Sequence, residues 1–492
     1  MDIGLELTPE RLARLEWAAP FVTASVAAIA EAEGIDDVPD SPRTTIPVRD
    51  EPCSVVPEVT EPYELGVVEA AVAIRRGQLL PAELLASCLT RIERTQPALG
   101  AFVRLTDDAA RTQADLAGQQ PPTGVLHGIP FAAKDLIDTS NVATEYGSAA
   151  FVGRVPPWDA TVVSRIRSAG GILVGKTATH EIAYGVSTPA VHNPWHPDRM
   201  ASGSSGGSAA ALAARQVPMA LGTDTGGSLR LPSAFCGTSA IRPTFGLIPR
   251  SGVMTLSASF DVVGPMARSA RDCLMLLRVL AGDPPAELVS PVVDLRQVRV
   301  GLADVATQHE VAVAETLRSL GAQIIEVTLP SLPITQAAAS VLVFAEAAAE
   351  FRQHLKRGAE FTEDIQAFLE AGLGVPVADF LHAQRVRNAI KRDYANLLGE
   401  VDVLLLPTSP VTELPHGVSS HDGVPLIPVL TPYTFPASLT GLPAIAFPCG
   451  FSRSGMPVGA QLMGPAHSET LLAAVVDAYQ QETDWHTRIP PV

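Results

Sequence analysis

The chain has 492 residues, of which 47% are hydrophobic and 18% charged, so it can bury a large core and is not a disordered protein. Its 35 basic and 52 acidic residues give a formal charge of −17, which argues against nucleic acid and anionic membranes as partners. Five cysteines without a metal-like spacing, and an N-terminus without a basic region followed by an apolar stretch, predict an unprocessed cytoplasmic protein without a metal.

The first 61 residues are expected to form an extension outside the main domain. Residues 8–34 are alanine-rich with helical spacing of apolar positions, and Thr8-Pro9-Glu10 is typical of a helix start. Residues 35–62 are acidic, rich in proline and without periodicity, which predicts a connector. We expect residues 1–61 either to support a homodimer or to cover the core of the main domain, residues 62–492.

The main domain has the pattern of an α/β fold. It opens with two helices, at 65–76 and 81–96, in which apolar residues recur at about 3.6-residue spacing. Short apolar runs then alternate with helices, which is typical of a buried parallel or mixed sheet. The expected strands are 172–174, 217–221, 298–302 and 323–327, and the helices among them are 160–169, 208–215 and one ending at 320. Residues 334–400 are predicted to be mostly helical.

Two glycine-rich loops hold serines suited to nucleophilic chemistry. The stretch 223–230 reads Thr-Asp-Thr-Gly-Gly-Ser-Leu-Arg, and its Ser228 follows two glycines whose amide hydrogens can face a developing oxyanion. The stretch 202–208 reads Ser-Gly-Ser-Ser-Gly-Gly-Ser and contains Ser204. A serine hydroxyl needs a base at neutral pH, and the candidate is Lys134, which follows Gly-Ile-Pro-Phe-Ala-Ala. This combination indicates acyl transfer.

Further segments strengthen a family resemblance. They are Gly175-Lys176-Thr177 leading to Glu181, Asn193-Pro194-Trp195, 242–246, 261–269, 406–408, and 441–443 with 455–462. Together with the serine loops, they resemble the amidase signature family over residues 62–486. The resemblance implies a three-layer α/β/α fold with a central mixed β-sheet flanked by many helices. It also implies amide hydrolysis without a cofactor, in a domain whose 334–400 segment covers the active site and shapes substrate choice.

The resemblance implies a Ser-Ser-Lys triad. Ser228 is the implied nucleophile, and Ser204, which follows a cis peptide bond in the family, is the implied proton relay. Lys134 is the implied base, and it must be neutral, so burial has to lower its pKa well below about 10.4. A surface lysine paired with Asp135 is the structural alternative for this residue.

Neighbouring residues are expected to support the triad. The implied oxyanion hole is formed by the backbone N–H groups of Thr225, Gly226, Gly227 and Ser228. Ser205 would orient the relay, and Asp224 and Arg230 would form a buried pair that braces the nucleophile loop. Ser202 stands where many relatives have glycine, so we expect its backbone to avoid a conformation that only glycine tolerates.

Three other motifs suggest different functions. Residues 170–177 match a phosphate-binding loop, but their interior is a β-branched run that predicts a buried strand. Residues 203–207 match a Gly-x-Ser-x-Gly elbow centred on Ser205, which leaves an α/β-hydrolase esterase as an alternative, although the preceding residues are loop-like. His192 and His196 are separated by Pro194, which argues against a shared helix and a metal site.

The sequence therefore predicts a small-molecule amidase that forms an acyl-enzyme. Carbamate and aryl-acylamide hydrolysis would use the same intermediate and stay open. The glutaminase subunit of a tRNA-dependent amidotransferase is another alternative, although the acidic extension and the absence of a matching glutamine-binding segment weigh against it. A non-catalytic assembly protein is disfavoured because all three triad positions are present.

Overall fold

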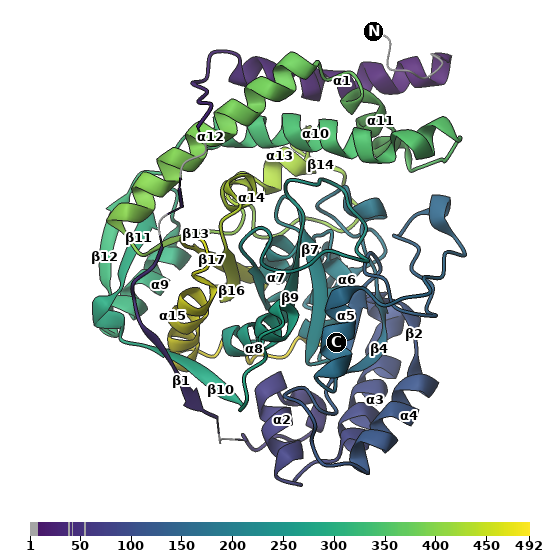
Figure 1. The fold of residues 1–492 in the computed structure, drawn as a ribbon, viewed down its shortest axis with the longest axis vertical. Coiled ribbons are helices and arrows are strands. Elements are labelled where there is room, and N and C mark those ends of the chain that lie inside the picture. The colour runs from purple at the N-terminus through teal and green to yellow at the C-terminus, as the bar shows by residue number, and fades with distance from the viewer. Residues whose placement is uncertain (1–7, 38–39, 42, 54–55) are drawn as a thin grey trace.

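The computed structural model describes residues 8–37, 40–41, 43–53 and 56–492, and its centre is a mixed sheet (Figure 1). The sheet has eleven strands in the order β12-β11-β13-β17-β16-β8-β9-β7-β3-β4-β2. In that order their bounds are Gln323–Val327, Arg299–Ala303, Val403–Pro407, Pro457–Met463, Ala444–Phe451, Ser239–Arg242, Val262–Ala267, Met219–Asp224, Pro130–Lys134, Ile172–Thr177 and Phe102–Leu105. This confirms the expected α/β architecture with a mixed central sheet.

Helices flank the sheet on both faces (Figure 1). The helices are α1 (Pro9–Ile29), α2 (Val67–Arg75), α3 (Pro81–Leu99), α4 (Asp107–Gly118), α5 (Thr161–Ser168), α6 (Gly206–Ala213), α7 (Arg230–Cys236), α8 (Ala270–Ala281), α9 (Gln308–Ser319), α10 (Leu332–Lys356), α11 (Glu363–Gly372), α12 (Val377–Glu400), α13 (Leu426–Leu430), α14 (Phe435–Thr440) and α15 (Glu469–Gln481). α6 is buried along its whole length, as its run of small and apolar residues predicts.

Strands β3, β4 and β7 bring the catalytic candidates together. β3 lies between the other two and runs parallel to both, so the carboxyl ends of all three strands meet at one edge. All three are fully buried, which explains why they appear in the sequence as continuous apolar runs. Ligand and catalytic sites of α/β sheets are commonly built at such edges.

A bulge interrupts the pairing of β3 with β4. Phe131 pairs with Leu173, whereas the next residue, Ala132, pairs with Gly175, so β4 holds one additional residue at this point. Beyond the bulge, Lys134 lies opposite Thr177.

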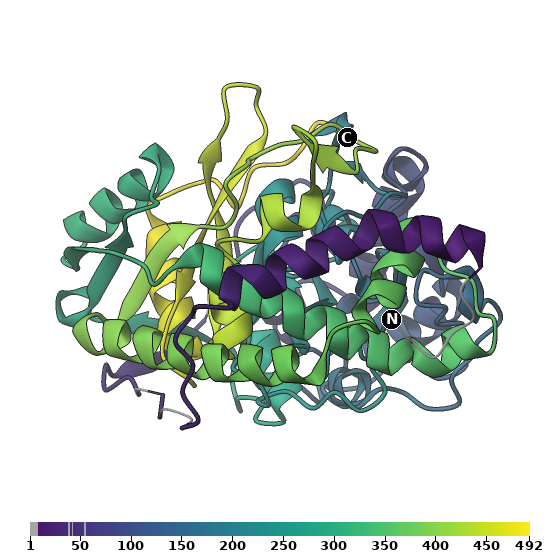
Figure 2. The ribbon, with the colours of Figure 1, turned by 90° about the horizontal axis from the view of Figure 1, so that it is seen from above.

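The N-terminal region is more ordered than the sequence suggests. α1 ends at residue 29, not 34, and packs against α10 and α11 (Figure 2). The expectation of an irregular connector over 35–62 is wrong at Val48–Pro52, which forms β1 and pairs antiparallel with β10 (Val289–Val293). A strand of five mostly exposed residues has no apolar alternation, and its pairing with a distant segment leaves no local signal.

Among the described residues, α1 and α10 have the length and apolar composition of a membrane-crossing helix. Most of the apolar stretch of α10 is buried against the rest of the protein, whereas α1 lies on the outside. Helices packed inside a protein core satisfy the same criterion, so these two helices are weak evidence for a membrane.

Candidate active site

Lys134 is the centre of a dry cluster of hydroxyl groups. Its side chain is fully buried at the end of β3, and its Nζ lies within hydrogen-bond distance of three hydroxyl oxygens, Ser204 Oγ at 2.8 Å and Ser205 Oγ and Thr223 Oγ1 at 2.9 Å. Burial lowers the pKa of Lys134 well below its usual value, against an opposing pull from Asp224 and from a second acidic residue, Asp261. The arrangement therefore favours a neutral amine next to hydroxyl groups.

The alternative of a surface Lys134–Asp135 pair is wrong. Asp135 is also buried, and its Oδ2 accepts the backbone N–H of Glu145 at 3.1 Å. Successive side chains near a strand end point to opposite faces, so the two neighbours face different parts of the protein. Burial raises the pKa of Asp135, and attraction to Lys176 on β4 and to Arg104 partly offsets that effect.

The Ser204 loop is anchored on both sides by backbone contacts. The peptide bond between Gly203 and Ser204 is cis, and the Ser204 carbonyl accepts His180 N–H at 3.2 Å and Thr188 Oγ1 at 3.3 Å. The expectation for Ser202 is wrong, because its φ of 60° lies in the left-handed region. Its hydroxyl donates to the Val186 carbonyl at 3.0 Å, which helps to hold this conformation.

The Ser228 loop requires its glycines. A methyl group on Gly227, whose φ is 134°, would lie 2.5 Å from Thr434 Oγ1, and one on Gly226 would lie 2.9 Å from Phe435 Cε1. Ser228 itself is 5% exposed, and its hydroxyl has no hydrogen-bond partner among the described residues. It is therefore free to contact an incoming group.

The amide hydrogens of this loop differ in their availability. Gly227 N–H is already donated to Asp224 Oδ1 at 2.9 Å. The N–H groups of Thr225, Gly226 and Ser228 have no acceptor among the residues that the structure describes. An oxyanion hole at this position would depend first on these three amides, and the full set of four remains a prediction.

Asp224 braces the loop with more partners than the sequence indicated. Its carboxylate is fully buried and forms ion pairs with Arg230 at 3.0 Å and with Arg242 at 2.9 Å. Burial favours the neutral acid, but attraction to the two guanidinium groups outweighs it and lowers the pKa of Asp224. Leu229 N–H also donates to this carboxylate, at 3.3 Å. The result is a charged brace that holds the backbone on both sides of Ser228.

Sequence reasoning gave no role to three residues that contact the site. Thr223 bonds Lys134, Arg242 completes the brace on Asp224, and Asp261 accepts Thr225 Oγ1 at 2.6 Å. A hydroxyl near the carboxyl end of a buried parallel strand was a usable signal for Thr223. Arg242 ends β8 and Asp261 directly precedes β9, and only the tertiary fold brings them to Asp224 and Thr225.

The competing motifs have structural roles. Residues 172–177 form β4, and the buried Lys176 Nζ donates to the carbonyl of Ile137 and to Thr144 Oγ1, not to a phosphate cradle. The strand that leads to Ser205 belongs to a separate two-stranded sheet, and the Ser205 hydroxyl contacts Lys134 and Thr223 instead of a histidine.

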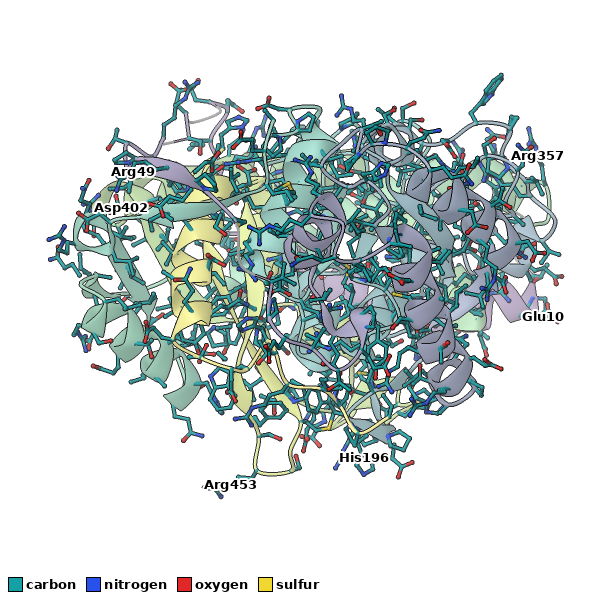
Figure 3. All side chains as sticks on the ribbon, turned by 90° about the horizontal axis from the view of Figure 1, so that it is seen from below. Glu10, Arg49, His196, Arg357, Asp402 and Arg453 are labelled. Atoms are coloured by element: carbon teal, nitrogen blue, oxygen red, sulfur yellow. The ribbon has the colours of Figure 1, made fainter. Side chains whose placement is uncertain are left out.

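The two histidines considered as a metal pair lie on a hairpin. β5 (His192–Asn193) and β6 (His196–Met200) pair antiparallel, and the His192 ring stacks on His416 with centroids 4.0 Å apart. Figure 3 places His196 at the periphery of the molecule.

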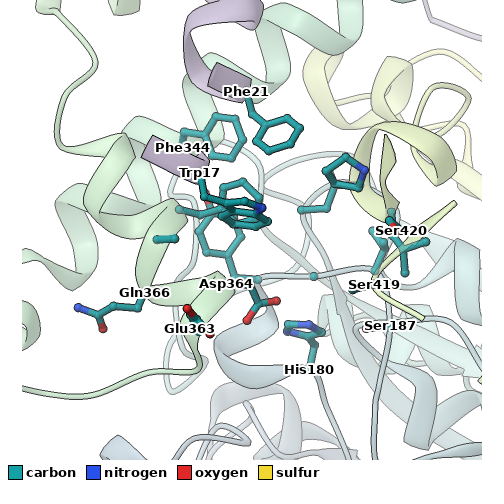
Figure 4. A pocket seen from close by; sticks show the side chains of 18 of the residues that line it. Trp17, Phe21, His180, Ser187, Phe344, Glu363, Asp364, Gln366, Ser419 and Ser420 are labelled. Carbon is teal, nitrogen blue, oxygen red and sulfur yellow. The ribbon is translucent and has the colours of Figure 1, made fainter. Parts of the chain in front are cut away.

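A large cavity adjoins the Ser204 loop. Its volume is about 1690 Å³, and its walls include His180, Val186, Ser187 and Thr188, which contact the Ser202–Ser204 segment (Figure 4). α1, α10 and α11 supply the opposite wall. The cavity is large enough to hold a small-molecule ligand.

Comparison with known proteins identifies the class. The sequence model of the amidase family matches residues 83–473, and the chain belongs to this family, whose signature motifs it carries. It is therefore an enzyme that hydrolyses amide C–N bonds.

Individual relatives differ in their described roles. The chain is 38% identical to one component of the glutamyl-tRNA(Gln) amidotransferase of Chloroflexus aurantiacus, over 88% of this chain and 99% of that protein. A crystal structure of an amidase matches with a TM-score of 0.78 at 32% identity, covering 85% of this chain and 100% of the other. The peptide amidase of Stenotrophomonas maltophilia matches with a TM-score of 0.73 at 28% identity, covering 87% and 98%.

Proposed function

We propose that the protein hydrolyses a small-molecule amide through a covalent acyl-enzyme on Ser228, with Ser204 as proton relay and Lys134 as base. The observation that carries the proposal is the 2.8 Å contact between Lys134 Nζ and Ser204 Oγ in a fully buried setting. Desolvation favours the neutral amine that a base requires. Carbamates and aryl-acylamides fit the same chemistry.

The reaction proceeds in two halves. In the first, Ser228 Oγ attacks the carbonyl carbon while its proton passes to Ser204 and the Ser204 proton passes to Lys134. The amide hydrogens of the loop stabilise the oxyanion, and one such donor contributes about 3–4 kcal/mol in other enzymes. The proton on Lys134 then returns through Ser204 to the leaving amine, which breaks the C–N bond. Water then attacks the ester on Ser228 and gives a proton through Ser204 to Lys134, and the return of that proton to Ser228 Oγ releases the acid.

The relay needs a hydrogen bond between the Ser204 and Ser228 hydroxyls. None is present in this structure, and catalytic hydrogen bonds commonly tighten only when substrate binds. Substrate binding against Ser228 is therefore expected to complete the chain from Lys134 to the nucleophile.

Mass spectrometry of the acyl adduct tests the proposal. The protein is mixed with a panel of simple amides, carbamates and esters, quenched and digested, and the adduct is mapped. We expect it on Ser228 and expect Ser228→Ala to abolish it, while Ser454→Ala, an exposed loop variant, retains it. An adduct on Ser205 would instead support the esterase mechanism.

The second candidate is the glutaminase component of an amidotransferase. The 38% identity to the Chloroflexus aurantiacus protein over 88% of this chain is the observation that favours it. Such a role predicts that the isolated protein is nearly inactive on simple amides, and that a partner protein and glutamine restore ammonia release. A steady-state assay that compares glutamine with other amides, with the protein alone, separates the two candidates.

A further inference from the structure

The cavity described above lies beside the Ser204 loop, and one of its wall residues is linked by hydrogen bonds to the Ser228 loop. On one side its wall residues Val186, Thr188 and His180 are hydrogen-bonded to the Ser202–Ser204 segment. On the other side Gln336 lines the cavity and donates to Thr431 Oγ1, three residues before the Thr434 hydroxyl that bonds Gly226. The cavity therefore lies against the Ser204 loop, and Gln336 links its other wall to the 431–434 segment that bonds the Ser228 loop.

An aromatic wall runs along the cavity. The rings of Trp17 and Phe368 have centroids 5.3 Å apart, and those of Phe344 and Phe368 are stacked at 5.5 Å. Phe21 joins them, 5.8 Å from Trp17 (Figure 4). Trp17 is 48% exposed, so much of its surface is available to a ligand. Trp17 and Phe21 belong to α1, which makes the N-terminal extension part of the cavity wall.

The charge of the lining is predominantly negative. Arg11 and Arg14 are the guanidinium groups of the lining, and they contact the buried Glu370 carboxylate at 2.9 and 3.1 Å. Four carboxylates line the cavity, those of Glu10, Glu360, Glu363 and Asp364. Glu363 and Asp364 begin α11, and neither has an ion-pair partner among the described residues. Anionic ligands are therefore disfavoured at the end of the cavity where α11 begins.

The position of these acids is fixed by a contact between two segments. Glu181 follows His180, and its carboxylate accepts the backbone N–H of Thr362 at 2.8 Å, directly before α11 begins. This bond holds the start of α11 over His180.

His180 presents a hydrogen-bond acceptor at the end of the cavity where α11 begins. The side chain is only 8% exposed, and Figure 4 shows the Asp364 carboxylate pointing toward its ring. Its Nδ1 lies 3.3 Å from the Glu181 carbonyl, and since a carbonyl only accepts, Nδ1 carries the proton. Nε2 of the neutral ring is then an acceptor, and no described residue donates to it. Burial lowers the pKa of His180 and so supports the neutral form.

We propose that the cavity selects amides that combine an aromatic group with a positively charged amino group. The aromatic part packs on Trp17, Phe21 and Phe368, and the ammonium group lies near Asp364, Glu363 and His180 Nε2. α1 is in consequence a specificity element of the enzyme. This inference rests on the proposed amidase function, because it assigns the cavity to the substrate of Ser228.

Four matched amides test the proposal. They are butyramide, phenylpropanamide, and phenylpropanamide with a para-aminomethyl or a para-carboxyl group. We expect kcat/KM to rise from butyramide to phenylpropanamide, to rise further with the ammonium group and to fall with the carboxylate. Trp17→Ala should lower the ratio of phenylpropanamide to butyramide about fivefold. The double variant Glu363→Gln/Asp364→Asn should lower the ratio of the ammonium to the carboxylate compound about tenfold, and salt should reduce that ratio in the parent enzyme.

Two variants on α1 serve as controls. Leu12→Ala and Glu16→Gln change exposed side chains outside the cavity, and both should retain the parent ratios. Two results would overturn the inference. One is a ratio of kcat/KM for phenylpropanamide to butyramide that is equal in Trp17→Ala and the parent. The other is equal kcat/KM of the parent enzyme for the ammonium and carboxylate compounds.

Binding to Ser228→Ala separates this inference from the proposed function. Calorimetry with the same four compounds measures selection by the cavity without turnover. Tighter binding of the ammonium compound without hydrolysis by the parent enzyme would mean that the proposed reaction fails and the inferred selectivity stands. Hydrolysis of all four compounds at similar rates, with equal affinities, would mean that the proposed reaction stands and the inferred selectivity fails.

Discussion

Replacing Asp224 with asparagine tests the charged brace under the nucleophile loop. Asn has a similar shape but no charge, so Arg230 and Arg242 would lose their shared counter-ion in a fully buried place. Breaking a buried ion pair by changing one partner costs about 3–5 kcal/mol. Arg230 keeps its contacts to Gln461 and Ser438, at 2.9 and 3.0 Å. We therefore expect Asp224→Asn to lower the free energy of unfolding by about 3 kcal/mol, near the lower limit.

The pH dependence of this loss has a defined sign. The pKa of Asp224 is lower in the folded protein than its ordinary value of 3.8, because the two arginines outweigh the effect of burial. A group of this kind stabilises the fold above its unfolded pKa, and the contribution disappears as the pH falls toward the folded pKa. The difference in unfolding free energy between the parent and Asp224→Asn should be constant above about pH 5 and shrink below about pH 4.

Urea unfolding followed by circular dichroism measures both effects. The control is Asp294→Asn, since Asp294 pairs with an Arg296 side chain that is 80% exposed, and this variant should unfold close to the parent midpoint. An Asp224→Asn protein with the parent midpoint at pH 7 would refute the reasoning. A loss that stayed the same at pH 3 would contradict the assignment of the effect to the charge of Asp224.

Three further predictions concern the site and its surroundings. Lys134→Met should lower kcat/KM by about 10²–10⁴-fold and remove the rise of kcat/KM with pH that deprotonation of Lys134 produces, which a pH–rate profile of both proteins checks. Gly227→Ala should destabilise the fold by about 1–3 kcal/mol because its methyl would lie 2.5 Å from Thr434 Oγ1, and an unchanged thermal midpoint would contradict this. Glu181→Gln should speed hydrogen exchange at the Thr362 amide, since the acceptor loses its charge, while exchange in β7 stays slow.

The strands that could be predicted are those whose burial gives the local sequence a continuous apolar run. β12 has the predicted bounds, Gln323–Val327, and β4 extends the predicted apolar run by three residues to Thr177. These segments succeed because buried parallel strands are continuous apolar runs. β1 was not predicted, because its residues are stabilised by a partner more than two hundred positions away and carry no periodicity of their own.

In the candidate site, too, residues with a local sequence pattern were predicted and those that depend on distant contacts were not. Glycine-rich loops and a lysine after an apolar run identified Ser204, Ser228 and Lys134, which the fold brings to one edge of the sheet. Ser202 was misjudged because a hydrogen bond from its own hydroxyl supports a backbone conformation that composition alone assigns to glycine. The share of α1 in the cavity depends on packing between segments far apart in the chain, which no local pattern encodes.

The bulge between β3 and β4 keeps two buried amines apart. Paired residues of parallel strands share a face, and without the additional residue in β4 the pairing would set Lys134 beside Lys176 on the same side of the sheet. With it, Lys134 shares its face with Thr177, and Lys176 turns to the opposite face toward Thr139 and Thr144. A single inserted position thus shields the two amines from mutual repulsion and leaves each proton affinity to be set by its own surroundings.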